Sequence, residues 1–243
     1  MRHRLDALVD RVFPGMGFRP LWIASAAAIL LTLYEYHGST TDVPSSFAAW
    51  SARTFAVEAP AFHGHLWSHC AAVVLLMLAP LVLSFTLEGW GPLQLGLGVR
   101  GAGRELGVVL LLWLAMLPVL ALVHDTPAFH RTYPRLPEAA TDVRLFLLYE
   151  GLYLVKWVAW EFFFRGFLLF GFARDFLYRA VLLSTVPFVL MHFGKPELET
   201  LGALVAGLIL CFIALRSRSI WPGVLLHWLV ATSLDGFAST WWR

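Results

Sequence analysis

The sequence predicts an all-α protein, a polytopic membrane helical bundle of about seven transmembrane helices. Of its 243 residues, 59% are hydrophobic and only 14% are charged, whereas soluble domains average about 25% charged residues. The mean hydropathy is +0.71. Apolar runs also recur along the chain, several of them close to the roughly 20 residues that a helix needs to cross a bilayer. These observations together favour an integral membrane protein.

The candidate spans follow one another along the whole chain and are separated by short polar turns or longer loops. They cover residues 21–36, 68–87, 105–123, 145–173, 177–193, 200–215 and 219–238. The segments at 37–67 and 124–144 are rich in Pro, Thr, Ser and Asp, which predicts loops outside the hydrocarbon. The long segment at 145–173 fits either one tilted helix or a shallow helix followed by a span.

Charge and cysteine content exclude several classes of protein. The formal net charge of +2 is too small and too dispersed for a nucleic-acid-binding surface, so the lipid bilayer is the expected partner. Cys70 and Cys211 have no paired spacing, which argues against a disulfide framework or a thiol zinc site. We expect the chain to be an integral membrane protein, located in a bacterial inner (cell) membrane.

The most informative stretch runs from Trp160 to Gly166, where Glu161 and Arg165 interrupt an otherwise apolar helix. Ionisable groups inside a bilayer are costly, so they usually mark a functional site and face one another. The acid precedes the base by four residues, the better orientation for a helical ion pair. A pair that merely neutralises itself in lipid is the alternative interpretation.

Two later apolar segments each carry one histidine, His192 and His227. Glu161 and His192 are 31 residues apart, with the basic turn Arg174 to Arg179 midway between them. Because a helix rises about 1.5 Å per residue, the chain returns to a similar depth, and His227 lies near the middle of the last span. We therefore expect the acid and both imidazoles to share one layer of the membrane.

A carboxylate and imidazoles suit the hydrolysis of a peptide bond without a covalent intermediate. The carboxylate can take a proton from a water, while another polar group stabilises the oxyanion. Zinc is the competing chemistry because two histidines and one glutamate can hold it, but no H-E-x-x-H motif is present, and we expect neither a metal nor a cofactor. A serine nucleophile is disfavoured since neither Ser184 nor Ser233 lies in a G-x-S-x-G motif.

These three segments resemble the CPBP family of intramembrane glutamic endopeptidases, which includes CAAX-processing, Ras-converting-enzyme-like proteases. The family signature is E-E-x-x-x-R, F-x-x-x-H and H-x-x-x-N or D on successive helices. Here the motifs are Trp160-Glu161-x-x-x-Arg165, Phe188-x-x-x-His192 and His227-x-x-x-Ala231. The resemblance covers about residues 145–238. It implies one membrane domain, with N-terminal helices and loops in 1–143 and the catalytic core in 144–243.

The resemblance implies that Glu161 and His192 activate water, that His227 supports the oxyanion, and that Arg165 sets the geometry of its helix. Two positions depart from the family pattern. Trp160 replaces the first glutamate, the one usually given the catalytic role, and Ala231 replaces the final amide. Other carboxylates are alternatives for the missing acid or polar group: Glu150, Glu197, Glu199 and Asp235.

The function expected from these residues is an intramembrane endopeptidase that cleaves membrane-anchored protein or peptide tails, such as CAAX-like ends or C-terminal sorting signals. The turn from Gly194 to Glu199 is expected either to be a plain interhelical connection or to form the mouth of the site, where Lys195 meets a substrate carboxylate. Two other classes stay open. One is an inactive membrane scaffold or bacteriocin-immunity protein, favoured by Trp160 and Ala231. The other is a proton-coupled transporter, although no repeated broken segments support it.

Overall fold

The computed structural model describes residues 2–38, 40–41 and 43–241. Within these ranges the chain forms helices, turns and loops, and no β-strand, so the all-α prediction is confirmed. The α-helices are α1 (Arg2–Val12), α2 (Phe18–His37), α3 (Ser45–Phe55), α4 (Pro60–Ala72), α5 (Ala79–Glu88), α6 (Ala102–Val123), α7 (Pro127–His130), α8 (Val143–Glu161), α9 (Phe170–Phe176), α10 (Ala180–Leu190), α11 (Glu197–Ser217) and α12 (Trp221–Ala238). Two π-helical turns interrupt longer helices, η1 (Val73–Leu78) and η4 (Phe162–Leu169), and short 3-10 turns are η2 (Pro92–Leu95), η3 (Pro137–Ala140) and η5 (Leu177–Arg179).

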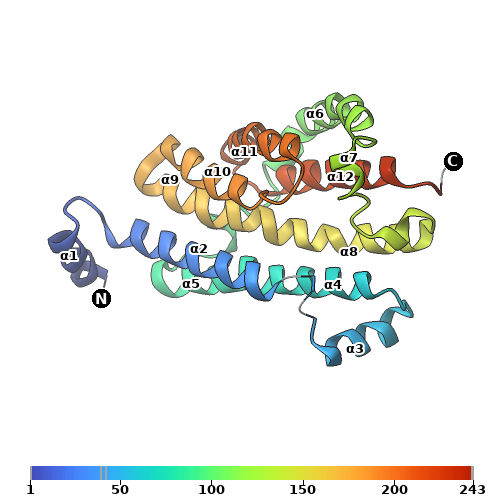
Figure 1. Ribbon diagram of the computed structural model, residues 1–243. Coiled ribbons are helices and arrows are strands. Elements are labelled where there is room, and N and C mark those ends of the chain that lie inside the picture. Colours follow the sequence, from blue (N-terminus) through green and yellow to red (C-terminus); the bar gives the residue numbers. More distant parts are fainter. Residues whose placement is uncertain (1, 39, 42, 242–243) are drawn as a thin grey trace.

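The helix α8 runs through the middle of the bundle (Figure 1). The helices α2, α4 and α5 lie along one side of it, while α6, α10, α11 and α12 lie along the other. The short helices α1 and α3 project from opposite ends of the α2–α5 side (Figure 1). Of the three motif helices, α12 packs against α8, and α10 packs against η4, the continuation of α8.

Helices form at all seven of the segments that the sequence predicts as spans, but the number of transmembrane helices is not confirmed as seven. Within the described ranges, three helices are long and apolar enough to cross a membrane: Pro60–Glu88, Ala102–Val123 and Glu197–Ser217. Helix α10 has only 11 residues, about 16 Å at the α-helical rise, which is shorter than the hydrocarbon core. The apolar helices agree with an integral membrane protein.

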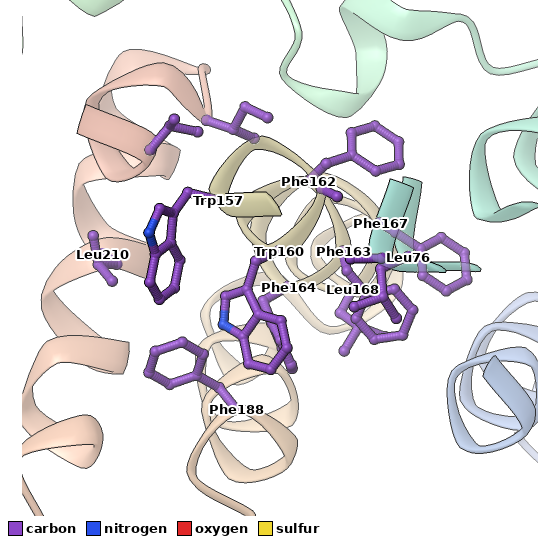
Figure 2. Close-up of a cluster of buried hydrophobic side chains, with 14 of the residues drawn as sticks. Leu76, Trp157, Trp160, Phe162, Phe163, Phe164, Phe167, Leu168, Phe188 and Leu210 are labelled. Carbon is purple, nitrogen blue, oxygen red and sulfur yellow. The ribbon is translucent and has the colours of Figure 1, made fainter. Parts of the chain in front are cut away.

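The segment from α8 to α9 is one uninterrupted helical run from Val143 to Phe176. It begins where the Asp142 carboxylate accepts hydrogen bonds from the backbone N–H groups of Arg144 (2.8 Å) and Leu145 (3.3 Å), a typical N-cap. All eight residues of η4 are buried, and Figure 2 shows its phenylalanines surrounding the helix axis and packing against Leu76 and Phe188. This aromatic packing holds the first motif rigidly inside the bundle.

Candidate functional site

Glu161 ends α8 and is completely buried. Its Oε1 atom accepts two hydrogen bonds, from Nη1 of Arg165 at 3.0 Å and from Nδ1 of His227 at 2.9 Å. Its Oε2 atom is buried and has no hydrogen-bond partner in the described part of the chain. The structure therefore brings together three of the four residues that the sequence singles out, and it pairs the acid with one of the two imidazoles directly.

Arg165 lies in η4, where the π-helical turn widens the helix by one residue, a feature frequent at functional sites. The guanidinium is buried, and its Cζ atom stacks 4.2 Å from the centroid of the Phe188 ring. The ion pair predicted at i and i+4 is present. Both members of the pair are buried, so the positive charge of Arg165 compensates the negative charge of Glu161. The Phe188 ring that stacks on the guanidinium fixes Arg165 in one orientation.

His227 reaches Glu161 from α12, and its imidazole stacks on the indole of Trp157, with ring centroids 3.8 Å apart. Since a carboxylate only accepts hydrogen bonds, the Nδ1 atom of His227 is the donor in the contact with Glu161. The neutral imidazole then carries its lone pair on Nε2. Trp157 and Glu161 together fix both the tautomer and the orientation of His227.

His192 follows the end of α10 and is buried. Its Nδ1 atom donates to the backbone carbonyl of Phe188 at 2.8 Å, so this imidazole also keeps its lone pair on Nε2. Among the described residues no hydrogen bond joins His192 to Glu161. The Phe188 ring contacts both imidazoles, with ring centroids 4.7 Å from His192 and 5.8 Å from His227.

A cavity of about 560 Å³ lies beside these residues, and its walls come mainly from α6, α11 and α12. The walls are mostly aliphatic, with a few polar side chains among them: Tyr133, Tyr153, His192, Lys195, Glu199 and His227. Glu161 and Arg165 are not part of the lining. Both imidazoles thus face a common apolar cavity, whereas the acid lies behind one of them.

The residues that depart from the family pattern lie in two environments. Trp160 is buried and packs against Tyr34 and Phe164, with centroid distances of 6.1 and 5.2 Å, while Ala231 lines the cavity with no polar atom to offer. Among the alternative acids, only Glu199 lines the cavity.

The other alternative acids lie away from the cavity wall. Glu150 accepts a hydrogen bond from the Thr232 hydroxyl at 2.5 Å, and Asp235 accepts one from the backbone N–H of Arg135 at 2.6 Å. Glu197 is exposed. Glu150 and Asp235 therefore help join α8, α12 and the loop before α8, and neither faces the cavity.

The competing chemistries find little support in the described part of the chain. No group of three or more His, Cys, Asp and Glu side chains there is placed to hold a metal ion. The hydroxyl groups of Ser184 and Ser233 donate to the backbone carbonyls of Phe164 and Leu229 at 2.7 Å each. These bonds commit the hydroxyl protons of both serines to neighbouring backbone.

Sequence reasoning missed two features of the site. One wall of the cavity is α6, together with Phe129 of α7 and Tyr133 from the loop after α7, and no motif marked them. Gly223 was also missed: a Cβ atom there would lie 2.7 Å from Oε2 of Glu161. A glycine just after Pro222 in an apolar helix is the signal that close packing was required at this position.

The fold and the site define a helical membrane protein with a buried acid, imidazole and guanidinium cluster beside an apolar cavity. Residues 143–233 match the family model described as type II CAAX prenyl endopeptidase Rce1-like. The match confirms the resemblance to the CPBP family and implies a protease of the CAAX type in a membrane. Comparisons with curated proteins and with solved structures found no match.

Replacing Gly223 by alanine should destabilise the protein by about 1–3 kcal/mol, the usual cost of forcing a methyl group into a packed interior. The new methyl would collide with the Glu161 carboxylate, which Arg165 and His227 hold in place. Gly236→Ala on the same helix is the matched control, because its Cβ atom would meet only Phe146 at 3.9 Å. Thermal unfolding in detergent measures both variants, and equal melting temperatures would contradict the proposed packing.

Proposed function

We propose that this protein is an intramembrane endopeptidase that hydrolyses a peptide bond in membrane-anchored protein or peptide tails by glutamate- and histidine-activated water. One observation carries the proposal: a buried carboxylate orients the imidazole of His227, which lines the same apolar cavity as His192. A buried acid that holds one imidazole tautomer is the arrangement by which several hydrolases raise the basicity of histidine.

In this proposal Glu161 acts through His227 instead of touching the water itself. The sequence hypothesis made Glu161 the base, but its oxygens lie away from the cavity wall and one of them already accepts two hydrogen bonds. The carboxylate stabilises the imidazolium that forms when His227 takes a proton. Arg165 holds the Glu161 carboxylate in position through their ion pair at 3.0 Å.

The chemical steps follow from the two free Nε2 atoms. A water held between them donates one hydrogen bond to His192 and loses its other proton to His227 as its oxygen attacks the peptide carbonyl. The carbonyl oxygen becomes an oxyanion. As the C–N bond breaks, His227 returns the proton to the leaving nitrogen, so one product ends in a carboxylic acid, which then loses its remaining proton to solvent, and the other begins with an amine. No covalent enzyme intermediate forms.

The aliphatic walls of the cavity support a substrate that is held by the membrane. Tails that end in a prenyl-cysteine group or C-terminal sorting helices are the candidate substrates, and the description of the matching family favours the first. Burial of such chains stabilises binding by about 25 cal/mol per Å² of apolar surface. A bacterial inner membrane is the proposed location.

The second candidate function is a catalytically inactive membrane scaffold or immunity protein that binds a peptide in the same cavity. The observation that favours it is the buried indole of Trp160 at the position where the family has its first glutamate. This candidate predicts peptide binding without cleavage.

Replacing His192 by alanine tests the two functions. We expect at least about a 100-fold loss of cleavage, the lower end of what a group taking part in proton transfer contributes. The assay measures hydrolysis of an internally quenched S-farnesyl peptide by purified protein in liposomes. His130→Ala, an exposed histidine, is the control and should cleave normally. Wild-type protein that binds the peptide but never cleaves it would establish the scaffold instead.

A further inference from the structure

The proposed reaction needs a hydrogen-bond donor for the oxyanion, and neither imidazole offers one in its resting state. The Nδ1 atoms of His192 and His227 already donate to Phe188 and Glu161, which leaves only lone pairs facing the cavity. Ala231, at the position where the resembling family has an amide or acid, has no polar side-chain atom. A donor aimed at the developing charge is usually the largest single contribution to such catalysis, so another group is required.

Lys195 reaches the cavity because of a tight turn after α10. Gly194 adopts φ of +89°, a conformation that residues with a Cβ atom rarely take. The turn closes with a hydrogen bond from the backbone N–H of Lys195 to the carbonyl oxygen of His192 at 3.2 Å. Both side chains line the same cavity. The glycine thus brings a cation to the wall that carries one of the two imidazoles.

A neighbouring acid holds the ammonium group of Lys195 in place. Its Nζ atom lies 2.7 Å from Oε1 of Glu199, and the hydroxyl of Tyr133 donates to Oε2 of the same carboxylate at 2.7 Å. Burial and the nearby carboxylate raise the pKa of Tyr133, so its hydroxyl stays protonated and donates. An ammonium group has three N–H donors. One bond to Glu199 leaves two of them, and the side chain keeps 23% of its surface exposed.

We propose that Lys195 is a further catalytic residue, which donates a hydrogen bond to the oxyanion of the tetrahedral intermediate in place of the missing side-chain amide. This inference rests on the proposed function. Lys195, His192 and His227 all line this cavity, so the ammonium group borders the space that both imidazoles face. Tyr153 also lines the cavity, but a charged donor stabilises an anion about twice as well as a neutral one.

The test compares Lys195→Met, which keeps the length of the side chain without its charge, with Lys195→Arg, which keeps a charged donor. We expect Lys195→Met to lower kcat for the S-farnesyl peptide by about 10²–10³-fold with KM unchanged, as for removal of one oxyanion donor. Lys195→Arg should recover most of the loss. Lys156→Met, a half-buried lysine that does not line the cavity, is the control and should keep its kcat.

A second measurement does not depend on turnover. A phosphinic analogue of the same peptide carries a tetrahedral anion where the scissile carbonyl would be. Wild-type protein should bind it more tightly than Lys195→Met does, by the same factor as the loss in kcat, because transition-state analogues report the same interaction. Lys195→Met leaves the Glu199 carboxylate without its lysine partner, which could disturb folding. The double variant Lys195→Met/Glu199→Gln removes that carboxylate as well, so a loss of kcat that remains in it reports catalysis and not a folding defect.

Each other outcome has one interpretation. A normal kcat in Lys195→Met would overturn the assignment. A large loss of kcat in Tyr153→Phe at the same time would make Tyr153 the oxyanion donor instead. A raised KM with unchanged kcat would make Lys195 a binding group for a substrate carboxylate, which also overturns it. If wild-type protein cleaves nothing yet binds the phosphinic peptide through Lys195, the proposed function fails, but Lys195 is still shown to bind a tetrahedral anion in the cavity. If that binding does not depend on Lys195, both fail.

Discussion

Glu161→Gln should lower kcat for peptide hydrolysis by about 10²–10⁴-fold and leave KM nearly unchanged. Glutamine keeps the shape of the side chain and an oxygen for the Nδ1–H of His227, but it has no charge to stabilise the imidazolium. The corresponding change in a serine protease triad costs about 10⁴-fold in kcat because the histidine adopts the wrong tautomer. Since Glu161 does not line the cavity, substrate binding should survive the change.

The measurement is steady-state hydrolysis of the S-farnesyl peptide, with the folded fraction checked by size-exclusion chromatography and thermal unfolding. Glu138→Gln is the control because this carboxylate is exposed and lies outside the cavity lining. Glu161→Gln with wild-type kcat would remove the carboxylate from the mechanism and leave Glu199 as the acid to examine next.

Arg165→Met should destabilise the protein by about 3–5 kcal/mol, the typical cost of removing one partner of a buried ion pair. Methionine fills much of the same volume against Phe188, but it leaves the fully buried Glu161 carboxylate with His227 as its only polar contact. At roughly 2–4 °C per kcal/mol for a chain of this size, the melting temperature should fall by about 6–20 °C. Arg131→Met, at an exposed arginine, should melt like the wild type.

The double variant Glu161→Gln/Arg165→Met completes the thermodynamic cycle. Because it removes both charges, it should be more stable than Arg165→Met alone, and the difference gives the coupling between the two residues. If the single and double variants melt together, the destabilisation comes from lost packing against Phe188 and the ion pair contributes little.

Composition and hydropathy were sufficient to predict the class of fold. Burial of apolar surface and satisfaction of backbone hydrogen bonds leave an apolar chain few options other than a helical membrane bundle. The number of spans was not predictable in the same way. Hydropathy marked 177–193 as a span, but α10 ends at Leu190 after 11 residues, because Met191 to Lys195 form the turn that returns to the cavity.

The sequence by itself identified Glu161, Arg165, His192 and His227, because ionisable groups are rare and costly in apolar helices. Only the tertiary structure decided how they are paired. It placed Glu161 against His227, set the Phe188 ring against both imidazoles, and brought Lys195, Glu199 and Tyr133 to the same cavity. These contacts join helices far apart in the chain, and their geometry depends on rotamers and close approaches, such as the one at Gly223, that no local pattern encodes.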